Sequence, residues 1–274
     1  MVLRDSGETG FCKTANQIKI AAWAHHRGEE PPISGQLGSG TIFSSNCTLG
    51  CCFCQNFPFS QLGNGQIMTP NQLGNIFSKL ADEGVHNLNF VTPTHVMPIL
   101  LQAWLESSPG AQSLPIVYNS SGYESVALLR LLEGIVDIYL PDIKYCSNPV
   151  ADDLSKCSNY VETNRKALKI MYEQVGDLCL DESGIATRGL IIRHLVLPDN
   201  LAGSRESFEW LRSELGTSVH ISLMSQYFPA YKAALHEKIN RPINENEYIE
   251  VLELIENMGF QNVWAQDPTE RGGA

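Results

Sequence analysis

The sequence lacks any apolar run of the roughly 20 residues that span a bilayer, and its first ten residues, MVLRDSGETG, contain no apolar signal-peptide core. It also lacks an excess of positive charge, because 19 Lys and Arg stand against 30 Asp and Glu, a net charge of −11. Such a surface repels phosphate backbones and anionic lipid. We therefore expect a cytoplasmic protein that binds neither nucleic acid nor membrane.

Internal repeats and low-complexity tracts are also missing, which argues against a solenoid and against disorder. The 274 residues, 43% of them hydrophobic, are enough to bury a substantial core. Residues 1–39 contain a short alternating stretch and then a segment rich in Gly and Pro, HHRGEEPPISGQLGSG. We expect them to form an N-terminal extension and loop, and residues 40–274 to form the core of the protein.

Short apolar runs alternate with helical patterns from residue 40 onward. Six runs predict strands, over 41–43, 88–91, 116–119, 136–140, 190–196 and 219–223. Helical periodicity is clearest after Thr69, a predicted N-cap that is followed by Pro70, and over 168–175 and 248–255. Further helices are expected over 98–106, 125–132 and 205–215.

This alternation predicts an α/β fold with parallel strands, because each helical crossover returns the chain in the same direction. The pattern by itself suits an open doubly wound sheet or a complete or partial barrel. In each of these folds, functional residues gather where the strands end at their carboxyl edge.

The most informative segment is the cysteine loop, residues 44–56, which has the sequence SSNCTLGCCFCQN. Cys47, Cys51 and Cys54 follow the first predicted strand with the spacing C-x3-C-x2-C. Three thiolates on one short loop can bind three irons of a four-iron cluster and leave the fourth iron without a protein ligand. An open iron of this kind is a site for chemistry.

Two simpler interpretations of the loop are a zinc site, completed by Cys52 or by a distant cysteine, and a buried group of inert thiols. Disulfides are disfavoured because bridges between such close neighbours are strained. Elsewhere, Cys146 and Cys157 are too few for a second cluster and are predicted to be free thiols. Cys12 has no predicted role.

The cysteine loop resembles that of the radical S-adenosylmethionine superfamily. Other motifs resemble the branch of pyruvate formate-lyase activating enzyme-like proteins: GEEPPISG (28–35), GSGTIF (38–43), CQN (54–56), VTPTH (91–95), YLPDIKY (139–145) and LMSQY (223–227). The likeness extends from about residue 7 to residue 267. It implies a partial (β/α)6 TIM-type barrel, with a [4Fe-4S] cluster on Cys47, Cys51 and Cys54 at its mouth.

The resemblance also implies an activity. S-adenosyl-L-methionine binds the open iron, is cleaved to a 5′-deoxyadenosyl radical, and the radical abstracts hydrogen from a substrate. The substrate is expected to be a glycyl radical enzyme, with a small molecule or another protein as the alternative. A reductant such as flavodoxin or ferredoxin is the expected partner. A non-catalytic iron–sulfur or zinc protein is the hypothesis from another class.

Seven residues are expected to contact S-adenosylmethionine, each after or within a predicted strand: Thr92, Thr94, Asn119, Asp142, Lys144, Arg193 and Gln226. Related enzymes have a Gly-Gly-Glu stretch where this sequence has residues 92–94, so hydroxyl or carbonyl oxygens replace a carboxylate there. Asp142 and Lys144 share a face by alternation. Arg193 lies in an apolar run, where an unpaired charge is costly. Glu30 and His95 are further candidates for the pocket.

Overall fold

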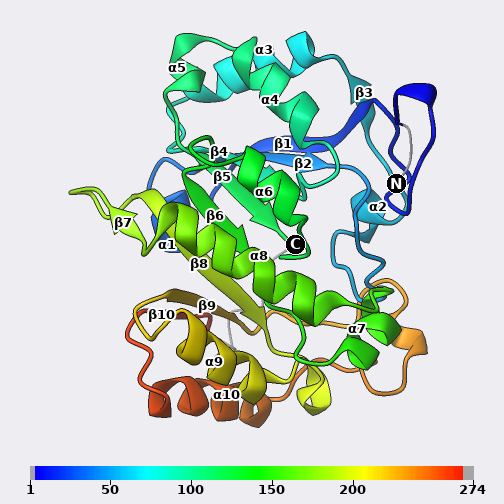
Figure 1. Ribbon diagram of the computed structural model, residues 1–274, viewed down its shortest axis with the longest axis vertical. Coiled ribbons are helices and arrows are strands. Elements are labelled where there is room, and N and C mark those ends of the chain that lie inside the picture. The colour runs from blue at the N-terminus through cyan, green and yellow to red at the C-terminus, as the bar shows by residue number, and fades with distance from the viewer. Residues whose placement is uncertain (1–3, 268–274) are drawn as a thin grey trace.

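The sequence's short β-branched runs form strands, and helices connect them, in a computed structural model that describes residues 4–267 (Figure 1). The strands are β1 (Ile18–His26), β2 (Ser39–Ser44), β3 (Gln66–Met68), β4 (Leu88–Val91), β5 (Ile116–Ser120), β6 (Ile138–Pro141), β7 (Cys179–Leu180), β8 (Ala186–Leu195), β9 (His220–Met224) and β10 (Val263–Ala265). All six predicted strands are present.

The helices are α1 (Pro31–Ser34), α2 (Phe57–Ser60), α3 (Pro70–Asp82), α4 (Met97–Leu105), α5 (Pro109–Gln112), α6 (Val126–Leu131), α7 (Asn148–Ser155), α8 (Tyr160–Val175), α9 (Ser204–Glu214) and α10 (Glu245–Asn257). Short 3-10 turns are η1 (Arg4–Ser6), η2 (Pro198–Asn200) and η3 (Ala233–Leu235). All six predicted helices are present. Thr69 caps α3 as expected, since its hydroxyl accepts from the Gln72 N–H and the Gln72 side chain accepts from the Thr69 N–H.

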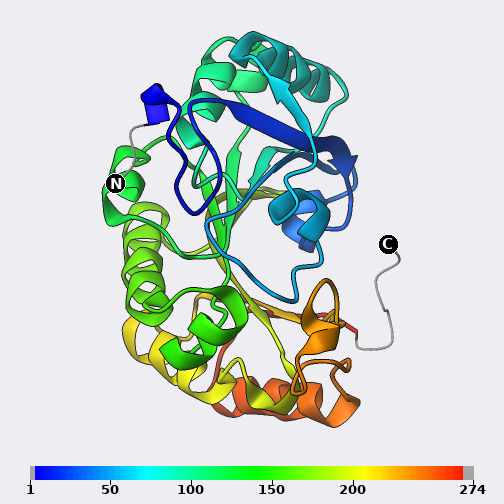
Figure 2. The same ribbon diagram turned by 90° about the vertical axis from the view of Figure 1, so that its right-hand side faces the viewer.

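The strands form one sheet in the order β10-β9-β8-β6-β5-β4-β2-β1-β3, with β7 paired to β8. From β2 to β10 the neighbouring strands are parallel, and this path of strands does not close. Helices cover the outer face of the curved sheet (Figure 2). The α/β class and the partial, open barrel are therefore confirmed. The sequence did not predict β10, which is only three residues long.

The segment expected to be an N-terminal extension contributes to this sheet. Its strand β1 pairs antiparallel with β2 and with β3. Ile18 and Ile20 of β1 are buried in the same apolar cluster as Phe77 and Leu80 of α3. The division at residue 39 stays a prediction, but β1 and the core after it share one sheet and one apolar cluster.

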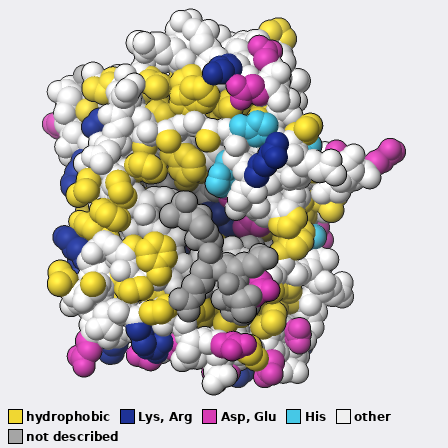
Figure 3. Space-filling view, turned by 180° about the vertical axis from the view of Figure 1, so that it is seen from behind, with side chains coloured by type: hydrophobic (Ala, Val, Ile, Leu, Met, Phe, Trp, Pro, Cys, Tyr) yellow, Lys and Arg dark blue, Asp and Glu magenta, His cyan; other side chains and the backbone are white. Residues whose placement is uncertain are grey.

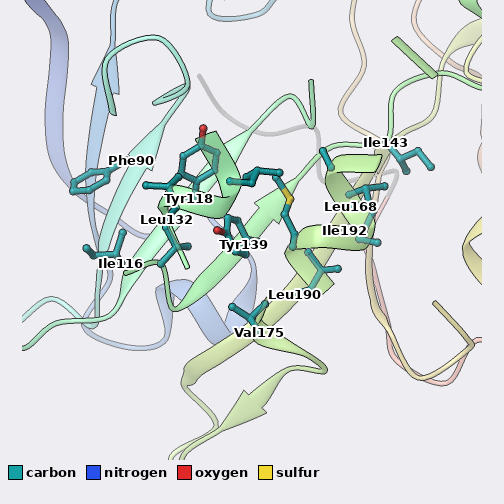
Figure 4. Close-up of a cluster of buried hydrophobic side chains, with 14 of the residues drawn as sticks. Phe90, Ile116, Tyr118, Leu132, Tyr139, Ile143, Leu168, Val175, Leu190 and Ile192 are labelled. Atoms are coloured by element: carbon teal, nitrogen blue, oxygen red, sulfur yellow. The ribbon is translucent and has the colours of Figure 1, made fainter. Parts of the chain in front are cut away.

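Two apolar layers lie on opposite faces of the sheet. The outer layer packs strand side chains such as Phe90, Tyr118 and Tyr139 against helices, including Leu168 and Val175 of α8 (Figure 4). The inner layer fills the lower part of the barrel with Ile33, Val117, Ile138, Leu140, Ala186 and Ile191. Ile33 comes from the short helix α1, so α1 plugs the interior below the carboxyl ends of the strands.

The surface carries charges of both signs. On the face opposite to that of Figure 1, Asp and Glu lie among Lys, Arg and hydrophobic side chains (Figure 3). No helix within residues 4–267 combines the length and the hydropathy that a membrane span requires.

The plug predicts a specific stability effect. Ile33 is 0% exposed, so Ile33→Ala leaves a cavity and lowers the free energy of unfolding by about 2–5 kcal/mol. Ile67→Ala in β3, where Ile67 is 61% exposed, is the matched control and changes it by less than about 0.5 kcal/mol. Urea unfolding followed by circular dichroism measures both. Equal effects of the two substitutions would contradict the role of α1 as a plug.

Candidate functional site

Polar side chains gather at the carboxyl edge of β5, β6 and β8. Asn119 belongs to β5, Asp142 directly follows β6, and Arg193 belongs to β8. Asp142 and Arg193 face each other through a parallel bridge between their strands. Because these parallel strands end at the same edge, they bring Asn119 and Arg193 together although the two residues are 74 positions apart in the sequence.

Arg193 lies at the centre of this group. Its guanidinium donates to the Asn119 side-chain oxygen, and it lies 3.4 Å from Glu29 Oε2 and 3.4 Å from Asp142 Oδ1. Burial alone would lower the pKa of Arg193, but Glu30, Asp142 and Glu29 together raise it. We call Arg193, Asn119, Asp142, Glu29 and Lys144 the Arg193 cluster. It holds a charged guanidinium in a position where an unpaired one would be costly.

Lys144 completes the cluster from the segment after β6. Its ammonium lies 2.5 Å from Asp142 Oδ2, as alternation predicts for residues on one face. Burial alone would lower the pKa of Lys144, but Asp142 raises it. The Tyr160 hydroxyl accepts from the Lys144 N–H at 3.0 Å and lies 2.9 Å from the Ser121 carbonyl. Gly122 is required nearby, because a Cβ there would lie 2.2 Å from the Asp142 carbonyl oxygen.

The interior beneath Arg193 is acidic. Asn89 donates to Glu29 Oε1 at 2.9 Å, and burial raises the pKa of Glu29 above its ordinary value although Arg193 lowers it. Glu30 is also buried, with Oε2 lacking a hydrogen-bond partner among the described residues, as does Asn89 Oδ1. Polar atoms of this kind are expected to meet water or a ligand.

The loop after β4 is held by a buried carboxylate that the sequence did not indicate. Thr94 donates to Glu124 Oε1 at 2.7 Å, and Tyr118 donates to Glu124 Oε2 at 2.9 Å. Burial raises the pKa of Glu124 to about 7. Thr92 has a left-handed backbone, with φ 57°, and its N–H donates to the Asn119 carbonyl at 2.8 Å. The Thr94 hydroxyl is thus already bonded to Glu124.

The cysteine loop leaves β2 at the same edge of the sheet. Each of its three spaced sulfurs has one hydrogen-bond contact: Cys47 with the Leu49 N–H at 3.4 Å, Cys51 with the Ser155 hydroxyl at 3.0 Å and Cys54 with the Ser60 hydroxyl at 3.1 Å. Backbone hydrogen bonds fix the loop between α7 and residues 230–239, which we call the 230s segment. The Cys52 N–H donates to the Leu154 carbonyl, and the Lys232 N–H donates to the Cys52 carbonyl, both at 2.8 Å.

The Cys47 and Cys51 thiols interact electrostatically with each other, with Cys54 and with Lys144. Burial is the main cause that raises the pKa of Cys47 to about 11 and that of Cys51 to about 12. The charge of Cys54 raises both values, whereas Lys144 lowers both. Lys144 therefore interacts electrostatically both with the cysteine loop and with Asp142 of the Arg193 cluster.

The donor set fits a cubic iron–sulfur cluster. Within residues 4–267 no group of three or more His, Cys, Asp and Glu side chains converges on a point where one metal ion could bind. A cubane does not need such convergence, because each cysteine binds a different iron at a different corner. Three cysteine sulfurs on one loop are the donors that three irons of such a cluster bind.

Several proteins of known structure have a similar fold. Streptococcus suis SuiB bound to S-adenosylmethionine superposes with a TM-score of 0.55 at 12% identity, covering 81% of this chain and 48% of SuiB. HydG, a maturase of the [FeFe]-hydrogenase, gives 0.58 at 11% identity, covering 85% of this chain and 53% of HydG. This chain thus spans about half the length of these structures.

In sequence, the uncharacterized protein MJ0674 of Methanocaldococcus jannaschii is 32% identical over 268 residues, which cover 94% of this chain and 72% of the relative. The chain belongs to the family of this archaeal protein, and it has the fold of the radical S-adenosylmethionine superfamily. No family model matches the sequence.

Within the radical S-adenosylmethionine fold, the structure brings together four of the residues that were predicted to contact the cofactor, Asn119, Asp142, Lys144 and Arg193. Gln226 is not among them. It follows β9 on the exposed surface, and its carbonyl accepts from the Gln55 side chain at 2.7 Å. The predicted cofactor contacts of all these residues, and of Thr92 and Thr94, stay predictions.

The remaining candidates have local roles. His95 Nε2 lies 2.8 Å from the Ser45 carbonyl and so joins the loop after β4 to the cysteine loop. All eight cysteines are free. Cys146 lies 3.9 Å from Glu206, away from Cys157, as expected for separate thiols. Cys12 is buried and accepts from Arg4 at 3.3 Å.

Sequence reasoning missed Glu124, Asn89 and Tyr160, and it did not select Glu29. Glu124 follows the end of β5 by four residues, and this position after a strand was a usable signal. Asn89 alternates with the outward Phe90 inside β4 and was hidden by its apolar neighbours. Tyr160 lies at the start of α8, where no local pattern indicates a contact with β6.

The raised pKa of Glu124 predicts a pH effect. The native carboxyl stays protonated up to about pH 7, whereas the unfolded one ionises near 4.5, so the native state binds more protons between these values. Stability therefore falls as pH rises through this window. Glu124→Gln removes this titrating group. Between pH 5 and pH 8 the free energy of unfolding of the variant is therefore expected to rise by about 2 kcal/mol relative to that of wild type. Urea unfolding at several pH values measures the free energy of unfolding of both proteins. If it depended on pH in the same way in wild type and in Glu124→Gln, the predicted effect of Glu124 would be contradicted.

Proposed function

We propose that the protein is a radical S-adenosylmethionine enzyme. Cys47, Cys51 and Cys54 would hold a [4Fe-4S] cluster whose fourth iron has no protein ligand. The observation that carries the proposal is the placement of the thiols and the Arg193 cluster at one edge of the sheet, because β2, β5, β6 and β8 run parallel and end there.

When bound, the reduced cluster supplies the electron that cleaves S-adenosylmethionine to methionine and a 5′-deoxyadenosyl radical, which abstracts hydrogen from the substrate. The residues of the chain bind and orient the cofactor. Lys144 offers a cation for its carboxylate. Asp142 and Asn119 offer oxygen acceptors beside it, and the backbone at Thr92 adds another carbonyl. The inner apolar layer, which includes Ile33 of α1, fills the interior of the sheet on the same side.

Arg193 is the residue that would keep these groups in place. It pairs with Asp142 and Asn119 at once, so it fixes the ends of β5 and β6 relative to β8. Gln226 is the weakest candidate for a cofactor contact, because it is exposed and outside the Arg193 cluster.

The substrate is proposed to be a protein. The sequence motifs resemble activating enzymes, which suggests a glycyl radical enzyme as the target. A peptide is compatible with the fold, since SuiB has been solved bound to its precursor peptide SuiA. Methylornithine synthase shares the fold at a TM-score of 0.52 and 14% identity, so a small-molecule substrate is the alternative. Deuterium transfer from labelled candidates into 5′-deoxyadenosine separates the two.

A low-potential reductant such as flavodoxin or ferredoxin is the proposed electron donor. A cytoplasmic location, where thiols stay reduced, suits eight free cysteines. Neither membrane nor nucleic acid enters the proposed reaction.

Two neighbouring cysteines test the proposal. Cys51→Ala is expected to lose bound iron and the release of 5′-deoxyadenosine, because it removes a cluster ligand. Cys52→Ala, the matched control, is expected to keep about four irons per chain and wild-type product formation, because Cys52 uses only its backbone to anchor the loop. Anaerobic reconstitution, iron analysis and chromatography of the products measure these outcomes.

The opposite pattern would reject the proposal. One zinc and no iron after anaerobic purification would indicate a zinc-stabilised scaffold. A complete, reduced cluster that releases no 5′-deoxyadenosine from S-adenosylmethionine would indicate a non-catalytic iron–sulfur protein.

A further inference from the structure

A cavity of about 340 Å³ opens on the outer side of the cysteine loop, away from the Arg193 cluster. Cys47 and Cys52 of the loop line it, together with Lys13, Lys156 and Lys232. Among the described residues that line it there is no Asp or Glu. The three lysines come from the N-terminal segment, the end of α7 and the 230s segment, so only the folded chain brings them together.

This local charge is opposite to that of the protein. The chain has a net charge of −11 and 19 basic residues, yet three of them surround one cavity. All three lysines are exposed, and within residues 4–267 none forms an ion pair. Lys156 donates to the Asp153 carbonyl at 3.1 Å, whereas the Asp153 carboxylate lies 2.9 Å from His236. The lysine charges are therefore available to an outside partner.

The backbone around the cavity is unusually constrained. Lys13 (φ 53°), Asn46 (φ 70°), Lys156 (φ 57°) and Tyr231 (φ 54°) line the cavity in left-handed conformations. Only three other non-glycine residues within 4–267 have a positive φ. Such conformations persist where the surrounding structure holds them, and they concentrate at functional sites. Lys13 is thus positioned by a left-handed backbone in a loop, whereas Lys156 is the left-handed C-cap that ends α7.

Aromatic surface accompanies the lysines. Phe11 is 60% exposed and lines the cavity. Tyr231 stacks on Phe57 with ring centroids 5.1 Å apart, and Lys232 lies over the Tyr231 ring. Phe11 is thus an exposed aromatic side chain at the cavity, and aromatic residues are enriched at protein interfaces.

We propose that this cavity and its three lysines are the docking surface for a small acidic redox protein that reduces the cluster. The proposal rests on the proposed function, since it requires a cluster on the cysteine loop. Cys47 is both a proposed cluster ligand and a wall of the cavity, so a docked donor would lie against the loop that holds the acceptor. One electron passes from the donor's cofactor, which is oxidised, to the cluster, which is reduced.

Charge reversal tests the docking surface. The triple variant K13E/K156E/K232E is loaded with the cluster and mixed with reduced flavodoxin and S-adenosylmethionine in an anaerobic stopped-flow instrument. The second-order rate constant for cluster reduction is expected to fall at least about tenfold at low ionic strength, and its dependence on salt to flatten. The control K79E/K166E/K169E makes the same change in net charge on α3 and α8 and is expected to keep the wild-type rate.

A chemical reductant separates this proposal from the proposed function. With dithionite, which needs no docking, wild type and both variants are expected to form 5′-deoxyadenosine equally. Equal flavodoxin rates in wild type and K13E/K156E/K232E, or no reduction of wild type by flavodoxin, would overturn the docking surface and would leave a small anion as the occupant that the lysines suit. Absence of product with dithionite in wild type would instead reject the proposed function.

Discussion

The buried pairing of Arg193 with Asp142 is the interaction on which the carboxyl edge of this sheet depends. A guanidinium inside an apolar strand is tolerated only when its charge is compensated. Here Asp142, which follows β6, and Glu29, from the loop before α1, compensate the charge, and the Asn119 side-chain oxygen of β5 accepts a hydrogen bond from the guanidinium. One side chain therefore fixes the relative position of β5, β6, β8 and the loop that carries the plug.

The same edge determines what the cysteine loop can do. Because β2 runs parallel to β4, β5, β6 and β8, the loop that leaves β2 emerges beside the Arg193 cluster rather than at the opposite end of the barrel. Lys144 lowers the pKa of Cys47 and of Cys51, and it forms an ion pair with Asp142. The outer side of the loop lies against α7 and the 230s segment, and it has a basic surface. One short loop thus has one side near the Arg193 cluster and another that lines the outer cavity.

Local patterns predicted the parts of this architecture that local physics determines. The Thr69 cap, the alternation of Asp142 and Lys144, and the isolated charge of Arg193 were all visible in the sequence. Contacts between distant residues were not. Ile33 fills the barrel from a four-residue helix, and Glu124 bonds Thr94 across 30 positions. Sequence periodicity does not encode which distant carboxylate satisfies a hydroxyl, or which lysines surround a cavity.

In the proposed enzyme, the three thiols would leave one iron open beside the Arg193 cluster. Electron paramagnetic resonance of the reduced, reconstituted protein, recorded with and without S-adenosylmethionine, tests whether this iron is open. Binding of the cofactor at the open iron predicts a change in the spectrum of the cluster. A spectrum that is identical in the presence and absence of S-adenosylmethionine would contradict the account.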